Sequence, residues 1–321
     1  MNNKPILVVA GEPYSVFLEL FFKAKKNFFK KPIILIASKK LVICQMEKLN
    51  FNFEINLINK NNINFNNLNK KKINLIDVNF DFNKIFDKIT DKSNFYINES
   101  FEIALKILKK KKCSGLINGP ISKKNFLKGR HLGITEYLAS KTNVKNNFAM
   151  LIYNKKLSVS PITTHLPLRT VHKNISKNKI IKQAELIKKF YKKYFKQSPK
   201  IGITGLNPHC ESNFKSSEED KFIKPSVKYL LKSGYNIKGP FAADTLFMKE
   251  QSDKYDVVIG MYHDQVLTPI KSLFGFDAIN ITLGLPFIRI SPDHGPNELM
   301  QGKNLSNPKS LIEALKFLDN K

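Results

Sequence analysis

Several residue types that carry specialised chemistry are scarce in this chain of 321 residues. Its three cysteines, Cys44, Cys113 and Cys210, lack C-x-x-C spacing, which argues against a disulfide framework and fits a reducing compartment. No apolar run approaches the ~20 residues of a membrane span, and the N-terminus lacks the apolar segment and cleavage site of a secretory signal. We therefore expect a cytoplasmic protein that does not enter a membrane.

Arginine is also scarce, although the formal net charge is +28. Of the 54 basic residues only Arg130, Arg169 and Arg289 are arginine, and lysine recurs with asparagine, isoleucine and phenylalanine along the whole length. This dispersion indicates a global compositional bias, and no helix-turn-helix, RNP-type sheet or zinc-finger spacing accompanies it. We expect no nucleic-acid partner, but a positive surface that attracts anionic small molecules.

Short apolar runs alternate with amphipathic stretches along most of the chain. Strands are predicted at residues 6–10, 32–37, 73–78, 115–118, 148–153, 200–204, 257–261 and 278–283, and helices at residues 98–112, 176–195, 218–232 and 307–318. Asn307 and Pro308 suit the N-cap and first position of the last helix, and the polar segment 52–69 suits a surface excursion.

Continuous β-branched strands between helices predict an α/β fold with a mostly parallel, doubly wound sheet. No Gly/Ser linker divides the chain. We therefore expect residues 1–321 to form a single catalytic chain of two α/β lobes, built by a folded-back chain around a cleft, with boundaries that the sequence does not place. In such sheets, ligands bind beyond the carboxyl ends of the strands.

Three of the six histidines, His165, His209 and His263, stand where strand-like runs end. A strand end followed by proline, asparagine or glycine lifts a side chain out of the core, and neutral imidazole is a common zinc ligand. The repeated context predicts one divalent metal site, whereas any one of these residues alone is more simply explained by a local backbone hydrogen bond. The gaps of 44 and 54 residues exclude a local motif such as H-E-x-x-H.

Nine short motifs occur along the chain. They are G-E-P at 11–13, N-G-P-I-S-K at 118–123, G-I-T-E-Y-L-A at 133–139, T-T-H-L-P-L-R at 163–169, G-L-N-P-H at 205–209, G-P-F-A-A-D-T at 239–245, Y-H-D-Q at 262–265, N-I-T-L-G-L-P-F-I-R at 280–289 and D-H-G at 293–295. Together and in this order they closely resemble the 4-hydroxythreonine-4-phosphate dehydrogenase family of pyridoxal phosphate biosynthesis. The resemblance runs from the first predicted strand to the last predicted helix.

This resemblance implies a fold like that of isocitrate and isopropylmalate dehydrogenases. It also implies oxidation of 4-phosphooxy-L-threonine by NAD or NADP to 2-amino-3-oxo-4-phosphooxybutanoate, which loses carbon dioxide to give 3-amino-2-oxopropyl phosphate. The family forms homodimers with the active site at the subunit interface. No G-x-G-x-x-G motif follows a strand, but the family binds its dinucleotide differently, so the cofactor-binding residues stay unassigned.

The resemblance also implies roles for particular residues. His165, His209 and His263 would hold one divalent metal (Zn, Mg or Co), with one of them donated by the partner subunit, and Thr135, Lys271, Asn280 and Arg289 would contact substrate. Arg289 is a credible substrate contact even without the resemblance, because a guanidinium retained in a lysine-rich chain suggests a need for a planar, bidentate donor. Asp244, Asp264 and Asp293 could orient an imidazole as carboxylates behind the ligands, or could be turn-formers and helix caps.

This chain differs from the family at position 134, where it has isoleucine and the family has histidine. It also lacks the glycines that the family usually has after Pro13 and after His209. His131 could replace the missing polar contact. The change at 134 leaves open another four-carbon acid phosphate, such as threonate or erythronate 4-phosphate. Two further classes also stay open: a metal-dependent hydrolase, because three histidines with an open position could activate water, and a nucleic-acid-binding protein without enzyme activity.

Overall fold

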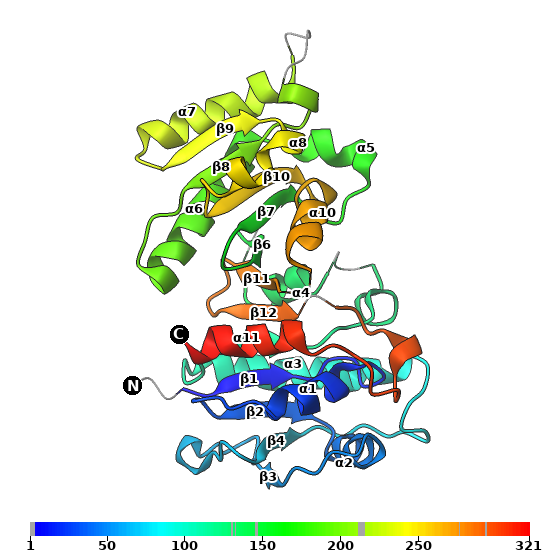
Figure 1. The fold of residues 1–321 in the computed structure, drawn as a ribbon. Helices are drawn as coiled ribbons and strands as arrows, with labels where there is room; N and C mark the ends of the chain where they lie inside the picture. Colours follow the sequence, from blue (N-terminus) through cyan, green and yellow to red (C-terminus); the bar gives the residue numbers. More distant parts are fainter. Residues whose placement is uncertain are drawn as a thin grey trace. The chain divides into compact units, whose positions relative to one another are not determined.

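The computed structural model describes residues 4–129, 131, 133–144, 147–210, 216–275, 277–292 and 294–321. The chain divides into two compact units, one formed by residues 1–141 and 286–321 and the other by residues 142–285. The fold class is the predicted one: each unit is an α/β structure, and most of its strands run parallel (Figure 1).

The first unit contains a parallel sheet in the order β3-β4-β2-β1-β5-β12. Its strands are β1 (Ile6–Val9), β2 (Ile33–Ala37), β3 (Ile55–Leu57), β4 (Ile73–Asp77), β5 (Gly115–Asn118) and β12 (Arg289–Pro292). Its helices are α1 (Phe17–Lys25), α2 (Lys39–Lys48), α3 (Asn94–Lys109), α4 (Ile134–Lys141) and α11 (Lys309–Asp319), with short turns η1 (Phe65–Asn67), η2 (Asp91–Ser93), η3 (Lys123–Leu127) and η7 (Glu298–Met300). Strands β1, β2 and β5 are completely buried, as the unbroken apolar sequences of β1 and β2 predict.

Helices cover both faces of this sheet. The crossovers β1-α1-β2 and β2-α2-β3 run outward in one direction, whereas β4-α3-β5 returns in the other. Because such crossovers are right-handed, α3 lies on the face opposite α1 and α2. The last helix, α11, packs against α1 and on β1, β5 and β12, so the end of the chain completes the core formed by its beginning.

The second unit contains a mixed sheet in the order β11-β6-β7-β10-β8-β9. Its strands are β6 (Ala149–Tyr153), β7 (Ser158–Thr163), β8 (Ile201–Thr204), β9 (Ile237–Phe241), β10 (Val257–Tyr262) and β11 (Ile279–Leu283). Its helices are α5 (Leu168–Val171), α6 (Lys177–Phe195), α7 (Lys224–Lys232), α8 (Ala243–Leu246), α9 (Lys249–Ser252) and α10 (His263–Phe274), with η4 (His172–Asn174), η5 (Pro208–Cys210) and η6 (Glu219–Ile223). Strands β7, β10, β8 and β9 run parallel, and β6 is antiparallel to both of its neighbours, β7 and β11.

All eight predicted strands are confirmed, but β3, β7, β9 and β12 escaped prediction. Strand β7 contains Ser158, Ser160 and Pro161, which disguise it as a loop. Its serine hydroxyls are satisfied internally, since Ser160 donates to the Met150 carbonyl at 2.6 Å. The predicted surface excursion 52–69 is wrong in part, because β3 within it pairs with β4. Helix α11 begins at Lys309, one residue late, yet the Asn307 side chain does accept from the Lys309 amide at 2.9 Å.

Candidate functional site

Three neighbouring strands of the second unit end beside the three predicted histidines. Strands β7, β10 and β8 are adjacent and parallel, so their carboxyl ends lie at the same edge of the sheet. His165 comes two residues after β7, His263 directly after β10 and His209 five residues after β8. Strand pairing therefore brings residues from distant parts of the sequence to one edge.

Two of these histidines are close together. The ring centroids of His165 and His263 lie 5.8 Å apart, and both rings are accessible to solvent. The Oδ1 atom of Asp264 lies 2.6 Å from Nδ1 of His263. A carboxylate on Nδ1 fixes a proton there and leaves Nε2 free to bind a cation, which is the arrangement of metal-binding histidines.

His209 occupies a tight turn at the end of β8. Its φ of 58° and that of Cys210, 57°, are left-handed values that L residues adopt only when surrounding contacts hold them. The contacts come from Glu219, whose Oε1 accepts from the amides of Leu206 at 2.7 Å and Asn207 at 2.9 Å. Burial raises the pKa of the Cys210 thiol, so this side chain is a packed thiol more than a reactive thiolate.

His209 does not form a close group with the other two histidines within one chain. Among the residues that the structure describes, no three His, Cys, Asp or Glu side chains are near enough to hold one metal ion. The His165 and His263 pair with Asp264 has the donor chemistry of a zinc-type site, but it supplies two imidazoles. Convergence of all three histidines stays a prediction.

Arg289 anchors a polar pocket in the first unit. Its guanidinium is fully buried, with Nε donating to Asn118 Oδ1 at 2.7 Å and Nη1 lying 3.3 Å from Thr135 Oγ1. Desolvation lowers its pKa to about 10, although the charge of Glu136 opposes this shift. The side chain therefore stays cationic at neutral pH, with Asn118 and Thr135 among its hydrogen-bond partners, as suits a binding site for an anionic ligand.

The pocket around Arg289 has a volume of about 450 Å³. Its wall is formed by residues 118–124 at and after the end of β5, with Ile89 and Ile134 adding apolar surface. The returning chain adds Arg289, Ser291 and Pro292 of β12, followed by His294, Gly295, Pro296 and Glu298. The pocket lies at the carboxyl ends of parallel strands, where α/β proteins bind ligands. Lys123 and Lys124 add positive charge to the wall, so the pocket suits an anionic molecule.

At Gly119 the backbone passes close to Ala10 and Phe17, which a glycine permits. A Cβ atom at Gly119 would lie 2.1 Å from the Ala10 carbonyl oxygen and 2.7 Å from the Phe17 ring, so any side chain would displace the turn. The neighbouring G-E-P motif packs against the same segment, since the Glu12 amide donates to the Pro120 carbonyl at 2.8 Å. Two motifs read separately in the sequence thus form one structure.

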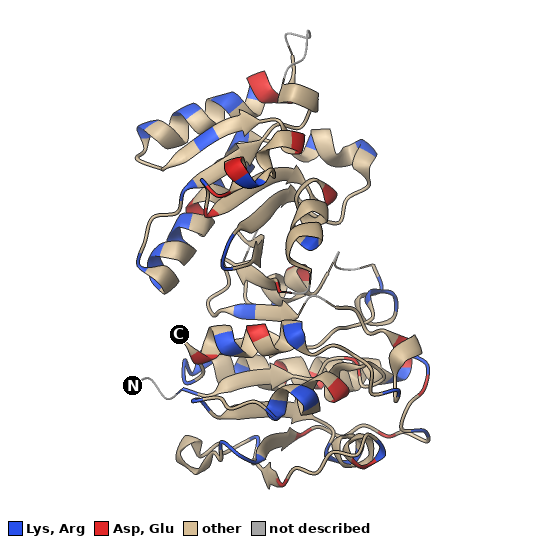
Figure 2. Ribbon diagram, viewed as in Figure 1, with Lys and Arg blue, Asp and Glu red and all other residues tan. Residues whose placement is uncertain are grey.

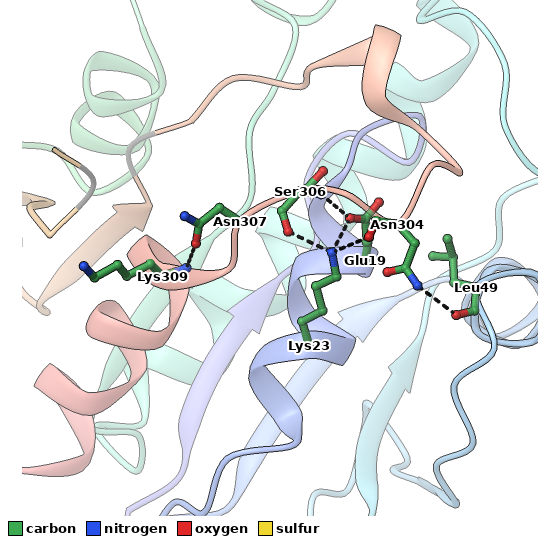
Figure 3. Close-up of polar contacts among 7 residues, drawn as sticks. All are labelled: Glu19, Lys23, Leu49, Asn304, Ser306, Asn307 and Lys309. Carbon is green, nitrogen blue, oxygen red and sulfur yellow. Dashed lines mark hydrogen bonds and ion pairs between the residues drawn. The ribbon is translucent and has the colours of Figure 1, made fainter.

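The chain that follows the pocket wall after β12 is anchored to α1 (Figure 3). Lys23 Nζ lies 2.8 Å from Glu19 Oε1 and donates to the carbonyls of Asn304 at 2.9 Å and Ser306 at 2.8 Å. Glu19 Oε1 also accepts from the Ser306 amide at 2.7 Å. Because Glu19 is buried, this set of contacts, which we name the α1 clamp, fixes where the returning chain meets the first helix.

The remaining predicted site residues that the structure describes lie in the second unit. Lys271 is exposed on α10, two helical turns after His263. Asn280 lies on β11, and its Oδ1 is buried without a hydrogen-bond partner among the described residues. Asp244 is exposed at the start of α8, where its Oδ1 accepts from the Thr245 amide at 2.8 Å, as a turn-former does. Asp293 lies outside the described residues.

Several residues at these sites were missed by sequence reasoning. Asn118 was noted only as part of a motif, and its contact with Arg289 joins residues 171 positions apart. Glu219 carried no signal at all, because one acidic residue in a polar stretch is unremarkable. His131, considered as a substitute for the family histidine at 134, instead packs edge-on against the Tyr137 ring, with centroids 5.8 Å apart.

Parallel strands that end in histidines, together with a cationic pocket at strand ends, define an α/β protein built to bind a small anionic ligand. Comparison with known proteins makes this specific. Residues 29–318 match the family model described as pyridoxal phosphate biosynthetic protein PdxA. The chain belongs to this family, and the resemblance seen in its motifs is confirmed.

Individual relatives cover nearly the whole chain. It is 38% identical over 319 residues to a 4-hydroxythreonine-4-phosphate dehydrogenase of Sulfurihydrogenibium, spanning 97% of this chain and 96% of the relative. It is 31% identical to an Oceanobacillus iheyensis protein with the provisional name D-threonate 4-phosphate dehydrogenase, over 98% of this chain and 97% of that one. A crystal structure of 4-hydroxythreonine-4-phosphate dehydrogenase from Klebsiella pneumoniae superposes with a TM-score of 0.84 at 25% identity, covering 99% of this chain and 100% of that one.

No helix within the described residues is both long enough and apolar enough to cross a membrane.

Proposed function

We propose that this protein is a metal-dependent, NAD- or NADP-linked dehydrogenase of 4-phosphooxy-L-threonine. The observation that carries the proposal is the pairing of His165 with His263 beside Asp264, at the strand edge that also bears His209, in a member of this family. Several of its relatives are named for this reaction. The product, 2-amino-3-oxo-4-phosphooxybutanoate, would lose its carboxylate as carbon dioxide to give 3-amino-2-oxopropyl phosphate.

The residues suit the chemistry of this oxidation. A divalent cation such as zinc, held by His165, His209 and His263, would acidify the substrate hydroxyl and later stabilise negative charge on its oxygen. Bound NAD or NADP would accept the hydride. Neutral imidazoles suit this role because they add no negative charge beside an anionic substrate. Asp264 would keep the proton of His263 on Nδ1, so that Nε2 faces the reacting centre.

Substrate binding falls to the cationic and amide groups. The Arg289 guanidinium, fixed by Asn118 and adjacent to Thr135, would bind an anionic group of the substrate. By the family motifs, Lys271 and Asn280 would also contact substrate. The buried Oδ1 of Asn280, which lacks a hydrogen-bond partner among the described residues, suits an acceptor awaiting a ligand donor. These assignments are supported by chemistry and by family motifs.

We further propose a homodimer in which one of the three histidines comes from the partner subunit. A shared site of this kind accounts for a single chain that brings His165 and His263 together without His209. It also accounts for the exposure of both His165 and His209 at the strand edge.

A coupled assay tests the function. Purified protein is incubated with 4-phosphooxy-L-threonine, either nicotinamide cofactor, and zinc, magnesium or cobalt, and absorbance of the reduced nicotinamide is followed. We expect turnover that a chelator abolishes and that His209→Ala lowers at least ~100-fold. His172→Ala, which changes an exposed histidine of the same unit away from the strand ends, serves as the matched control. Full activity after exhaustive chelation would contradict the proposal.

A second substrate has a specific observation in its favour. Ile134 lines the Arg289 pocket where the family has histidine, and the Oceanobacillus relative is named for D-threonate 4-phosphate. An apolar side chain cannot hydrogen-bond a substrate amine or hydroxyl, so the preference for an amino acid could be weakened here. D-Threonate and D-erythronate 4-phosphates belong in the same assay, and a higher kcat/KM for either would reassign the substrate within the same chemistry.

A further inference from the structure

The three strand ends that carry the predicted histidines are joined by side-chain hydrogen bonds. We propose that Gln265 is a positioning residue that holds the His209 turn and the His263 strand end in register, with Glu219 as its counterpart on the other side of the His209 turn. This inference rests on the proposed function of the histidines and assigns a role that the proposed metal ligands and substrate contacts leave unexplained.

At this edge of the sheet, the Gln265 side chain uses both acceptor positions of Oε1 and one of the two N–H donors of Nε2. Its Oε1 accepts from the Met261 amide at 2.7 Å and from Thr204 Oγ1 at 2.9 Å. Its Nε2 donates to the Gly205 carbonyl at 2.8 Å. Met261 belongs to β10, two residues before His263, whereas Thr204 and Gly205 end β8 and begin the turn that leads to His209. One side chain thus connects the strand ends on which two predicted ligands depend.

Further hydrogen bonds join these two strand ends to β7 on one side and to Glu219 on the other. Thr163, at the end of β7 and two residues before His165, donates from Oγ1 to the Met261 carbonyl at 2.8 Å. Glu219 binds the His209 turn through the amides of Leu206 and Asn207, and its Oε2 accepts from Asn207 Nδ2 at 2.8 Å. Thr163 and Thr204 are buried, as is Glu219, so water does not compete readily for these bonds.

These hydrogen bonds lie where a support for the predicted ligands is needed. Strands β7, β10 and β8 are already paired through their backbones, and those bonds fix the strands but not the turns beyond them. The left-handed backbone of His209 and Cys210 is uphill for non-glycine residues and needs fixed partners. A metal ligand misplaced by 1 Å loses much of its contribution, so buried, satisfied bonds behind the ligands are a general feature of such sites.

Mutation can separate the two hydrogen bonds that Gln265 accepts from the one that it donates. Gln265→Glu keeps an oxygen for Met261 and Thr204 but places an acceptor against the Gly205 carbonyl, whereas Gln265→Leu removes all three bonds. The matched control is Gln183→Leu, because Gln183 is a buried glutamine of the same unit that donates to Ser160 Oγ at 2.8 Å and the Pro161 carbonyl at 2.9 Å, within β7 and away from the turns.

Two measurements on the purified full chain test the role: titration with Co²⁺ alone, followed by its visible absorption, and amide hydrogen exchange. We expect Gln265→Leu to weaken Co²⁺ binding ~10–100-fold, Gln265→Glu to weaken it less, and Gln183→Leu to change it less than twofold. Exchange at the amides of Leu206, Asn207 and Met261 should accelerate in both Gln265 variants and stay as in wild type in the control.

The outcomes separate this role from the proposed function. Wild-type Co²⁺ affinity in Gln265→Leu, or equal losses in Gln265→Leu and Gln183→Leu, would overturn the positioning role. If wild-type protein binds no Co²⁺, the metal-dependent function fails on its own, and exchange decides the network: faster exchange confined to the Gln265 variants supports it, and unchanged exchange overturns it.

Discussion

Glu12 is a single residue whose ionisation the fold opposes. It follows β1 and is 1% exposed, and its carboxylate accepts from Ser93 Oγ at 3.2 Å and interacts with the backbone amide of Tyr14, while its Oε1 has no partner among the described residues. Desolvation by burial raises the pKa of this carboxyl to about 7 from its ordinary 4.5, although the Ser93 bond acts in the opposite direction. A carboxylate that has too few donors is costly to bury.

The sign of the resulting pH dependence follows from proton uptake. Between pH 4.5 and about 7 the folded protein keeps a proton on Glu12 that the unfolded chain releases, so the free energy of unfolding falls as pH rises through this window. Above it the loss is on the order of 3 kcal/mol. Glu12→Gln cannot ionise, so it should be more stable than wild type by about that amount at about pH 8 and nearly equal below about pH 4.5.

Urea unfolding at several pH values measures this difference. Glu47→Gln, at an exposed position on α2, should leave the pH profile of wild type unchanged. Parallel profiles for wild type and Glu12→Gln would show that the Glu12 carboxyl is solvated or paired in the folded protein, contrary to its observed surroundings.

At the scale of elements, the α1 clamp connects the first helix to the chain that returns after β12. Lys23→Met removes three donor contacts and leaves buried Glu19 with the Ser306 amide alone. Removing one partner of a buried ion pair typically costs ~3–5 kcal/mol, and partial exposure of Lys23 should reduce this to ~2–3 kcal/mol. Amide exchange should also accelerate at Ser306, whereas α6 in the other unit should be unaffected.

A double-mutant cycle shows whether the contacts act together. Glu19→Gln removes the buried charge that Lys23 compensates, so the combined Lys23→Met and Glu19→Gln variant should lose less stability than the sum of the single changes. Additive losses would mean that Lys23 and Glu19 stabilise the fold independently, through the carbonyls and the Ser306 amide respectively.

Other elements show why some were predictable and others were not. Strands β1 and β2 are buried on both faces, so unbroken apolar sequence marks them. Strand β7 is equally buried, yet its serines bond within the protein and its sequence resembles a loop. Helices α1 and α2 were missed because α1 is buried almost all round, Glu19 and Lys25 included, and residues 39–48 have little amphipathic contrast.

At the scale of the whole molecule, net charge governs encounter with ligands. Lys and Arg occur on helices and loops of both units (Figure 2), and the formal net charge is +28. If the substrate is a phosphorylated acid, kcat/KM should fall ~3–10-fold as ionic strength rises from ~10 to ~150 mM, because screening shortens the range of attraction from ~30 to ~8 Å.

Steady-state kinetics at fixed metal and cofactor concentrations measure this effect. The value of kcat at saturating substrate should change much less, since encounter no longer limits the rate. A kcat/KM independent of salt would mean that the dispersed lysines do not steer the substrate and that binding depends on local contacts such as those of Arg289.

The sequence by itself determined the alternation of strands and helices, the mostly parallel α/β class, the family and the position of histidines at strand ends, because these depend on local patterns and on motifs. Only the tertiary structure decided which strands are neighbours. The order β7-β10-β8 places His165 beside His263, and β5-β12 pairing places Asn118 against Arg289. Strand order is set by packing of the whole core, so contacts between residues far apart in the chain, and the role of a bridging side chain such as Gln265, have no local signature.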